Sequence, residues 1–435
     1  MSIEFSRLPA VIAALCSITF VSLNSGNAAE TTGADAARPS LILISIDGFR
    51  HDYQERFPTP ALDRIAKRGV RAESMQPVWP TLTFPNHYSI ATGLYPADHG
   101  IVANEFPDEQ RQHWYRYKDR EAVQDGRWYR GEPLWVAAER AGMISAAFYF
   151  VGTEAPIDGI SPSHWRAFDA SVPGEDRIRQ ALDWLALPLE ARPQVITLYF
   201  EQVDEASHRY GPGSAECVAA IARVDGWIGE LLDGIEKMGL GAELHIAVVS
   251  DHGQGEYRRD AEPLVLSDFL DLEGVTIVES GAFAMLYLDE QDLFRAIQIR
   301  DEVNARWNNG HAWLQKEAPA FWQVSSSRRF GDVLLQADPG FAVLSTREQQ
   351  KKMTPGDHGW SPNMRDMHGI FLVAGPRLPA GRRIATIRAT DAYPLLLELI
   401  GLPDGREQPP ASPLCDLLEA KAACKTAQAD SPGPR

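Results

Sequence analysis

Aspartate and histidine residues follow several apolar runs of this sequence, at positions where their side chains could share metal ions. They are Asp47 after residues 40–46, Asp204 and His208 after residues 195–200, Asp251 and His252 after residues 244–250, and His358 before Gly359. Three aspartates and three histidines exceed the four ligands of one tetrahedral zinc ion, and they suit two metal ions at bridging distance. Mixed carboxylate and imidazole ligands favour zinc over Ca²⁺ or Mg²⁺, with Mn²⁺ as the alternative.

A hydroxyl group and an amide group could complete such a site. Thr83 lies where the sequence predicts a loop entering a helix, at the expected N-cap, with Pro85 in the first turn. A hydroxyl there would face the positive end of the helix dipole, and contact with a metal would favour its alkoxide form. Asn104, downstream, could donate a hydrogen bond to a phosphoryl oxygen. We expect the other eight histidines to be structural: His51, His87, His99, His113, His164, His245, His311 and His368.

Strands and helices alternate along most of the chain. We expect strands at residues 40–46, 195–200, 244–250 and 370–374, and helices at residues 61–68, 134–141, 178–187 and 219–238. This alternation predicts an α/β fold with a mostly parallel central sheet flanked by helices. Ligands of such sheets bind beyond the carboxyl ends of the strands, where these Asp and His residues lie. Residues 262–350 have a different pattern, which predicts a small α+β insert.

The charge balance limits what the protein can bind. The 435 residues include 42 Lys and Arg against 59 Asp and Glu, a net charge of −17. A chain this acidic is not expected to bind a nucleic-acid polymer along a basic groove. Two divalent ions beside three aspartates would nevertheless make the site locally positive, so it could hold a phosphate group.

The termini have compositions of their own. Residues 1–29 resemble a secretory signal peptide with small residues at its end, and residues 30–39 a linker. We expect the signal to be removed rather than kept as an anchor. The protein is then periplasmic or secreted and has no stable membrane span. In the C-terminal tail, residues 403–435, Cys415 and Cys424 are the expected disulfide pair, which leaves Cys217 as a buried thiol.

The segment from Thr83 to Tyr88, TFPNHY, closely resembles the signature of the nucleotide pyrophosphatase/phosphodiesterase family in the alkaline phosphatase superfamily. The resemblance continues through residues 92–104, 131–135, 204–212, 250–253 and 358–376. It covers residues 40–402, which we take as one phosphodiesterase catalytic domain of the minimal bacterial form. The resemblance implies an alkaline-phosphatase-like fold.

The resemblance also implies roles for individual residues. Thr83 is similar to the family's nucleophile, which lies between two zinc ions. One zinc would be bound by Asp204, His208 and His358, and the other by Asp47, Asp251 and His252. Asn104 and the backbone N–H of Phe84 match the donors to the phosphate oxygens. Substrate-pocket positions are matched by Phe84, Tyr199, Phe150, Phe168 and Glu154, although Phe150 could instead belong to the strand core.

The activity implied is a zinc-dependent hydrolase with a phospho-threonine intermediate. It would cleave phosphodiester and phosphoanhydride bonds of small nucleotides and release nucleoside 5′-monophosphates. The alternative is a phosphodiesterase acting on choline or glycerol phosphodiesters from lipids, because aromatic cages also hold choline. A non-catalytic zinc or phosphate binder is disfavoured, because the nucleophile, Asn104 and all six ligand positions are present.

Overall fold

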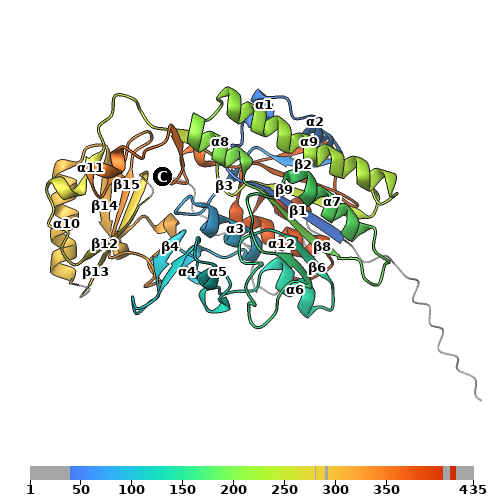
Figure 1. Cartoon of the computed structure of the whole chain (residues 1–435), viewed down its shortest axis with the longest axis horizontal. Helices are drawn as coiled ribbons and strands as arrows, with labels where there is room; N and C mark the ends of the chain where they lie inside the picture. Colours follow the sequence, from blue (N-terminus) through green and yellow to red (C-terminus); the bar gives the residue numbers. More distant parts are fainter. Residues whose placement is uncertain (1–39, 280, 290–291, 405–411, 418–435) are drawn as a thin grey trace, which may run out of the picture. The chain divides into compact units, whose positions relative to one another are not determined.

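An eight-stranded sheet forms the centre of the chain in the computed structural model, which describes residues 40–279, 281–289, 292–404 and 412–417 (Figure 1). The strand order is β19-β2-β18-β9-β1-β8-β6-β7. All the pairings are parallel except those of β18, which is antiparallel to both β2 and β9. The strands are β1 (Ser40–Ile46), β2 (Gly69–Ala72), β6 (Ser145–Phe148), β7 (His164–Arg166), β8 (Val195–Phe200), β9 (Leu244–Val249), β18 (Phe371–Ala374) and β19 (Arg382–Ile384).

Helices cover both faces of this sheet. Leu41 and Leu43 of β1 pack into one core with α3 (Thr83–Thr92), α6 (Leu134–Arg140) and α12 (Ala392–Leu399). Ile42, Ile44 and Ile46 pack on the other face with α2 (Pro60–Arg68), α7 (Gly174–Leu185) and α9 (Ala215–Lys237). Alternate side chains of a strand point to opposite faces, so burial on both faces explains the unbroken apolar run of β1. The predicted α/β fold with a mostly parallel sheet is confirmed.

A second, four-stranded antiparallel sheet has the order β12-β13-β15-β14. Its strands lie within residues 262–350, the range of the predicted insert, and α10 (Leu293–Arg306) packs against it (Figure 1). Ala296, Ile299 and Val303 of the helix share a core with Leu286 and Leu335 of the sheet. The strands are β12 (Val275–Glu279), β13 (Phe283–Leu288), β14 (Gly310–Leu314) and β15 (Val333–Ala337).

Shorter elements complete the described chain. The helices are α1 (Tyr53–Arg56), α4 (Pro96–His99), α5 (Arg120–Val123), α8 (Gln202–Tyr210) and α11 (Arg347–Gln350). The strands are β3 (Met75–Gln76), β4 (Glu105–Pro107), β5 (Trp114–Arg116), β10 (Gly255–Glu256), β11 (Leu264–Val265), β16 (Val343–Leu344), β17 (Gly356–Asp357) and β20 (Ile387–Arg388).

Several sequence expectations concern residues outside the described ranges. These are the signal peptide at residues 1–29, the linker at residues 30–39 and Cys424 of the expected Cys415–Cys424 pair. Cys217 is described, and it is buried with a free thiol. Within the described ranges, no helix combines the length and the apolar character needed to cross a membrane.

Candidate active site

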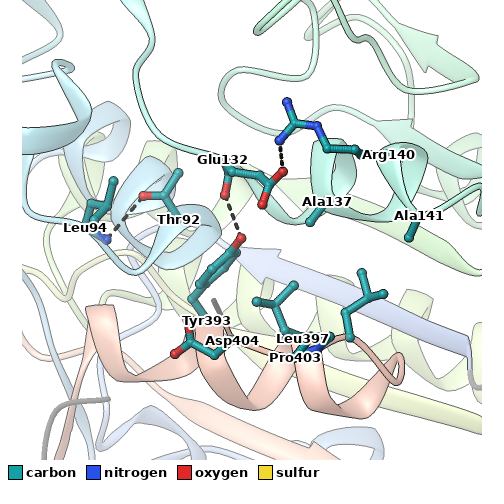
Figure 2. Close-up of a pocket in the computed structure, with 11 residues that line it drawn as sticks. Thr92, Leu94, Glu132, Ala137, Arg140, Ala141, Tyr393, Leu397, Pro403 and Asp404 are labelled. Atoms are coloured by element: carbon teal, nitrogen blue, oxygen red, sulfur yellow. Dashed lines mark hydrogen bonds and ion pairs between the residues drawn. The ribbon is translucent and has the colours of Figure 1, made fainter. Parts of the chain in front are cut away.

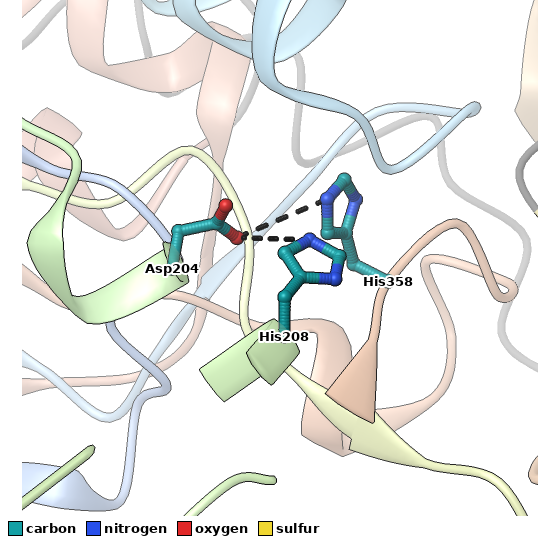
Figure 3. Close-up of side chains that lie close together, drawn as sticks. All are labelled: Asp204, His208 and His358. Atoms are coloured by element: carbon teal, nitrogen blue, oxygen red, sulfur yellow. Dashed lines mark ion pairs between the residues drawn. The ribbon is translucent and has the colours of Figure 1, made fainter. Parts of the chain in front are cut away.

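One group of ligand-type side chains joins α8 to the loop that follows β17. The Oδ1 atom of Asp204 lies 3.5 Å from Nε2 of His208 and 3.8 Å from Nε2 of His358 (Figure 3). Asp204 and His208 are one helical turn apart on α8, so both side chains point to the same side of the helix. One oxygen and two nitrogens that lie within 4.8 Å of one another could hold a metal ion.

A second group lies at the carboxyl ends of two neighbouring strands, β1 and β9. Asp47 follows β1, whereas Asp251 and His252 follow β9. Nε2 of His252 lies 3.0 Å from Oδ2 of Asp251 and 3.6 Å from Oδ1 of Asp47. The two groups adjoin, because ligand atoms of Asp47, Asp204 and His252 also lie within 4.8 Å of one another. The structure therefore brings together all six predicted ligands.

Unsatisfied lone pairs show that the second group suits a cation. Oδ1 of Asp47 and Oδ2 of Asp251 are buried and have no hydrogen-bond donor. Nδ1 of His252 lies 3.0 Å from the carbonyl oxygen of Gly253, so this nitrogen carries the proton in the neutral ring and Nε2 presents a lone pair. Two carboxylate oxygens and one imidazole nitrogen thus converge, which is the donor set of a divalent ion. Despite burial, Asp251 raises the pKa of His252 and stabilises a proton on this ring, and a bound cation would take the place of that proton.

The other two histidines present the same ring nitrogen. Nδ1 of His208 lies 3.0 Å from the Gly356 carbonyl oxygen, and Nδ1 of His358 lies 2.8 Å from the Thr81 carbonyl oxygen. These bonds leave both Nε2 atoms directed at Asp204. Burial, with the neighbouring rings of His252 and His208, holds the pKa of His358 well below its usual range and keeps the ring neutral, as a metal ligand must be.

Electrostatic repulsion among the carboxylates also favours bound cations. Burial and the nearby carboxylates of Asp251 and Asp204 raise the pKa of Asp47 well above its usual range. These causes all disfavour the ionised form of Asp47 in the absence of a cation. Divalent ions placed among the three aspartates would reverse that effect. The residues present therefore fit a metal centre.

Thr83 lies beside this centre, but it is not the N-cap of its helix. The N-cap of α3 is Leu82, and Thr83 is the first helical residue. The preceding loop is held by Asn86, whose amide donates to the carbonyl oxygens of Pro80 and Leu82 and accepts from the N–H of Val78. The N-cap prediction for Thr83 was wrong by one position, since Asn86 organises the helix start. Oγ1 of Thr83 lies 3.5 Å from Nε2 of His252.

The two predicted phosphate donors are bonded to each other. The backbone N–H of Phe84 donates to Oδ1 of Asn104 over 3.1 Å. Only the oxygen of the Asn104 amide can accept a hydrogen bond from an N–H group, so this bond fixes the orientation of the amide. The NH₂ group of Asn104 is then the donor available to a ligand in the cavity that Thr83, Phe84 and Asn104 all line.

This cavity has a volume of about 370 Å³ and has aromatic walls. Phe84 packs against Tyr117, with ring centroids 5.7 Å apart, and Phe168 lies 6.0 Å from Tyr199. Phe150 lines the cavity and also belongs to the core, because it is 5% exposed and its ring contacts that of His87. All five predicted pocket residues line the same cavity as Thr83, Asp47, Asp204, His208 and His358.

Glu154 does not stand free in this cavity. Its carboxylate accepts hydrogen bonds from the N–H of Phe168 over 3.1 Å and from the Gln124 amide over 3.3 Å, and it forms an ion pair with Arg120. Arg120 is the one Lys or Arg among the described residues that line the cavity. The pair places a guanidinium group in the cavity wall and leaves Glu154 little capacity for a ligand.

Three residues contact the predicted ligands in ways that the sequence did not predict. Nδ1 of His87, expected to be structural, lies 3.3 Å from Oδ2 of Asp251, and the amide of Gln254 donates to Oδ1 of Asp204. The hydroxyl of Tyr199 donates to Asp47. His87 lies one helical turn after Thr83, and this spacing could have indicated from the sequence that His87 lies near the site. Both nitrogens of His87 have closer partners, the Thr83 carbonyl oxygen and the Ser45 hydroxyl, so it supports the ligands.

A second cavity of about 460 Å³ lies between α6 and α12 (Figure 2). The Tyr393 hydroxyl donates to the carbonyl oxygen of Glu132 across it, and Arg140 pairs with the Glu132 carboxylate. Its described lining residues include none of the predicted site residues. The chemistry is therefore expected at the first cavity.

Known proteins resemble this chain in sequence. Human ectonucleotide pyrophosphatase/phosphodiesterase family member 1 is 33% identical over 374 residues, which are 84% of this chain and 40% of that protein. The chain thus spans less than half the length of this relative. Bovine bis(5′-adenosyl)-triphosphatase ENPP4 is 30% identical over 376 residues, 85% of this chain and 80% of that protein.

Solved structures agree with the sequence comparison. Human ectonucleotide pyrophosphatase/phosphodiesterase 5 superposes with a TM-score of 0.80 at 28% identity, covering 88% of this chain and 100% of that one. An inactive threonine-to-alanine variant of the murine protein, in complex with AMP, superposes with a TM-score of 0.78 at 27% identity. The match covers 83% of this chain and 95% of that one. The family model for type I phosphodiesterase / nucleotide pyrophosphatase matches residues 41–361. The predicted family is confirmed: this chain belongs to the type I phosphodiesterase / nucleotide pyrophosphatase family.

Proposed function

We propose that this protein is a two-zinc phosphodiesterase and pyrophosphatase that releases nucleoside 5′-monophosphates from small nucleotides. One observation carries the proposal. Two adjoining Asp/His groups and the Thr83 hydroxyl, 3.5 Å from Nε2 of His252, lie at a cavity with aromatic walls. The arrangement combines a place for cations, a nucleophile and a surface for a planar group.

The proposed metal ligands fall into two sets. Asp204, His208 and His358 would hold one zinc ion, and Asp47, Asp251 and His252 the other. Zinc bound there would supply Lewis-acid stabilisation of negative charge and would lower the pKa of a nearby hydroxyl group or water. A set of three oxygens and three imidazole nitrogens supports zinc over magnesium or calcium.

Thr83 is the proposed nucleophile. Its Oγ1 forms a bond to phosphorus while the bond from phosphorus to the leaving oxygen breaks, and the hydroxyl proton passes to solvent or to the leaving oxygen. Water then attacks the phospho-threonine, restores the Thr83 hydroxyl and releases the phosphate monoester. During both steps the NH₂ group of Asn104 donates to a non-bridging oxygen, because its oxygen is already bonded to the Phe84 N–H.

The cavity supports a nucleotide substrate over a choline diester. A nucleobase between Phe84 and Tyr199 would gain roughly 1–3 kcal/mol from stacking. A quaternary ammonium group is held over aromatic faces, and a guanidinium group in the same wall would repel it. Here Glu154 is paired with Arg120, so a cation is already present in the wall. The AMP complex of the murine relative also supports a nucleotide ligand.

The test is to identify the products formed from ATP by the zinc-loaded protein, beside a chelated control. We expect AMP and pyrophosphate, lost on chelation. Thr83→Ala should lower turnover on the order of 10³-fold or more, whereas the matched variant Thr83→Ser keeps a hydroxyl and should retain far more activity. Unchanged turnover in Thr83→Ala would refute the nucleophile. Hydrolysis of an aryl phosphodiester without hydrolysis of ATP would favour the choline or glycerol diesters.

We also propose that the protein is exported to the periplasm or secreted. The support is the apolar segment within residues 1–29, with small residues at its end. N-terminal sequencing of the protein recovered from outside the cytoplasm should begin near Ala29 or Glu30. A mature protein that retains Met1 would contradict this.

A further inference from the structure

The hydroxyl of Tyr199 lies 2.6 Å from Oδ2 of Asp47, one of the proposed metal ligands. A phenol, with a pKa of about 10 in model peptides, is a far weaker acid than a carboxyl group at about 3.9, so Tyr199 donates the proton. Hydrogen bonds of this length to an ionised acceptor are among the strong ones in proteins. The bond therefore constrains how the Asp47 carboxylate can rotate.

The constraint directs the other oxygen of Asp47 toward the metal centre. Oδ1 has no hydrogen-bond partner although it is buried, and it lies 3.6 Å from Nε2 of His252. With Oδ2 bonded to Tyr199, Oδ1 is the oxygen left for a cation. A carboxylate without this bond could rotate or present both oxygens. A ligand oriented in advance binds a metal more tightly.

Tyr199 is itself held firmly. Strands β1 and β8 are parallel neighbours, and their register places Tyr199 opposite Ser45. Ser45 precedes Asp47 by two residues, so Tyr199 is fixed close to Asp47. The carbonyl oxygen of Tyr199 accepts from Nη1 of Arg177 over 2.7 Å, and Arg177 is fully buried and bonded twice to Glu201 at 2.6 Å. The hydroxyl therefore rests on a rigid part of the sheet rather than on a mobile loop.

The ring of the same residue faces the substrate cavity. Tyr199 lines that cavity, and its ring centroid lies 6.0 Å from the centroid of Phe168. One side chain thus contacts the expected nucleobase position with its ring and a metal ligand with its hydroxyl.

We propose that Tyr199 is a positioning residue whose hydroxyl orients Asp47 for the metal, beside the role of its ring in the substrate cavity already described. This inference rests on the proposed metal-dependent function. It assigns the two tasks to different atoms, so substitutions can separate them.

The test compares Tyr199→Phe with Tyr149→Phe. Tyr149 lines the same cavity, but its hydroxyl donates to the carbonyl oxygen of Asp169 over 3.1 Å. Zinc affinity is measured without substrate, by competition with a chromogenic chelator. Tyr199→Phe should weaken one of the two zinc-binding steps by about 10- to 100-fold, and Tyr149→Phe should leave both unchanged. At saturating zinc, Tyr199→Phe should retain the KM for nucleotide, because the ring is kept.

A second variant keeps the inference falsifiable if the first fails to fold. Tyr199→Leu removes both ring and hydroxyl, so it should weaken zinc to the same degree and also raise KM. If either variant bound zinc with wild-type affinity, this inference would be overturned but the proposed function would stand. A wild-type chain that binds no zinc would overturn the proposed function and this inference together.

Discussion

Removal of the Asn104 amide tests whether this residue stabilises the phosphoryl group during reaction. Its oxygen accepts the Phe84 N–H over 3.1 Å, so its NH₂ group is the single donor it offers to the cavity. Loss of one such donor typically lowers kcat by about 10²- to 10³-fold, or about 2.7–4 kcal/mol. We therefore expect Asn104→Ala to lower kcat on an aryl phosphodiester by about this factor.

Asn104→Asp makes the prediction sharper, because it keeps the shape of the side chain. The introduced carboxylate would still accept the Phe84 N–H, but it would present an anionic oxygen where the NH₂ group stood. Two like charges 4 Å apart repel by about 4 kcal/mol at an effective dielectric constant of 20. Asn104→Asp should therefore be less active than Asn104→Ala, even though it preserves the local hydrogen bond.

The assay is steady-state kinetics of both variants, loaded with zinc, at several salt concentrations. Zinc content and thermal unfolding of each variant are the controls, and both should match the wild type. Added salt should narrow the gap between the two variants, since it screens the repulsion. An Asn104→Ala variant within about threefold of wild type, or an Asn104→Asp variant more active than Asn104→Ala, would refute this role.

Two further predictions concern the substrate pocket and the acid stability. Phe84→Ala keeps the backbone N–H but removes the ring, so it should raise the KM for nucleotides by the loss of roughly 1–3 kcal/mol of stacking, with little change for a diester whose retained group is methyl. Equal effects on both substrates would argue against a base stacked on Phe84. Burial lowers the pKa of His99 to about 3 from its ordinary 6.5, so the unfolded chain binds a proton here that the folded chain does not. The free energy of unfolding should therefore fall as pH drops from about 6.5 toward 3. Denaturant unfolding should show that the free energy of unfolding of His99→Gln falls less steeply over this pH range than that of the wild type. The same pH dependence in both proteins would contradict the role of His99.

Strands buried on both faces were the most predictable part of this fold. Apolar runs predicted the bounds of β1 and β8 as the structure has them, and a carboxylate, Asp47 or Glu201, directly follows each run. Helix starts were harder. The helix expected at residues 178–187 begins at Gly174, since Pro173 caps it in an extended conformation while its first turns are partly exposed. The antiparallel direction of β18 depends on tertiary pairing, which no local pattern encodes.

The candidate site also has parts that the sequence could predict and parts that it could not. Asp47, Asp204 and Asp251 could be predicted to meet, because parallel strands deliver their carboxyl ends to one edge of a sheet. The pairing of Glu154 with Arg120 could not, since it joins a loop to a short helix 34 residues earlier in the chain and has no periodic signal. The hydrogen bond from Tyr199 to Asp47 depends on the register of β1 against β8, which the sequence leaves open.

Local charge explains how so acidic a chain could hold a phosphate ester. Without cations, the cavity wall carries Asp47, Asp204, Glu201 and Glu205, and an anionic substrate would be repelled. Arg177 and Arg120 neutralise only Glu201 and Glu154. On the proposed function, two divalent ions would turn the three-aspartate centre from −3 to about +1. Substrate affinity must then depend on metal occupancy, and by linkage bound substrate must strengthen metal binding by the same factor. A substrate analogue that left zinc affinity unchanged would show that phosphate is held elsewhere.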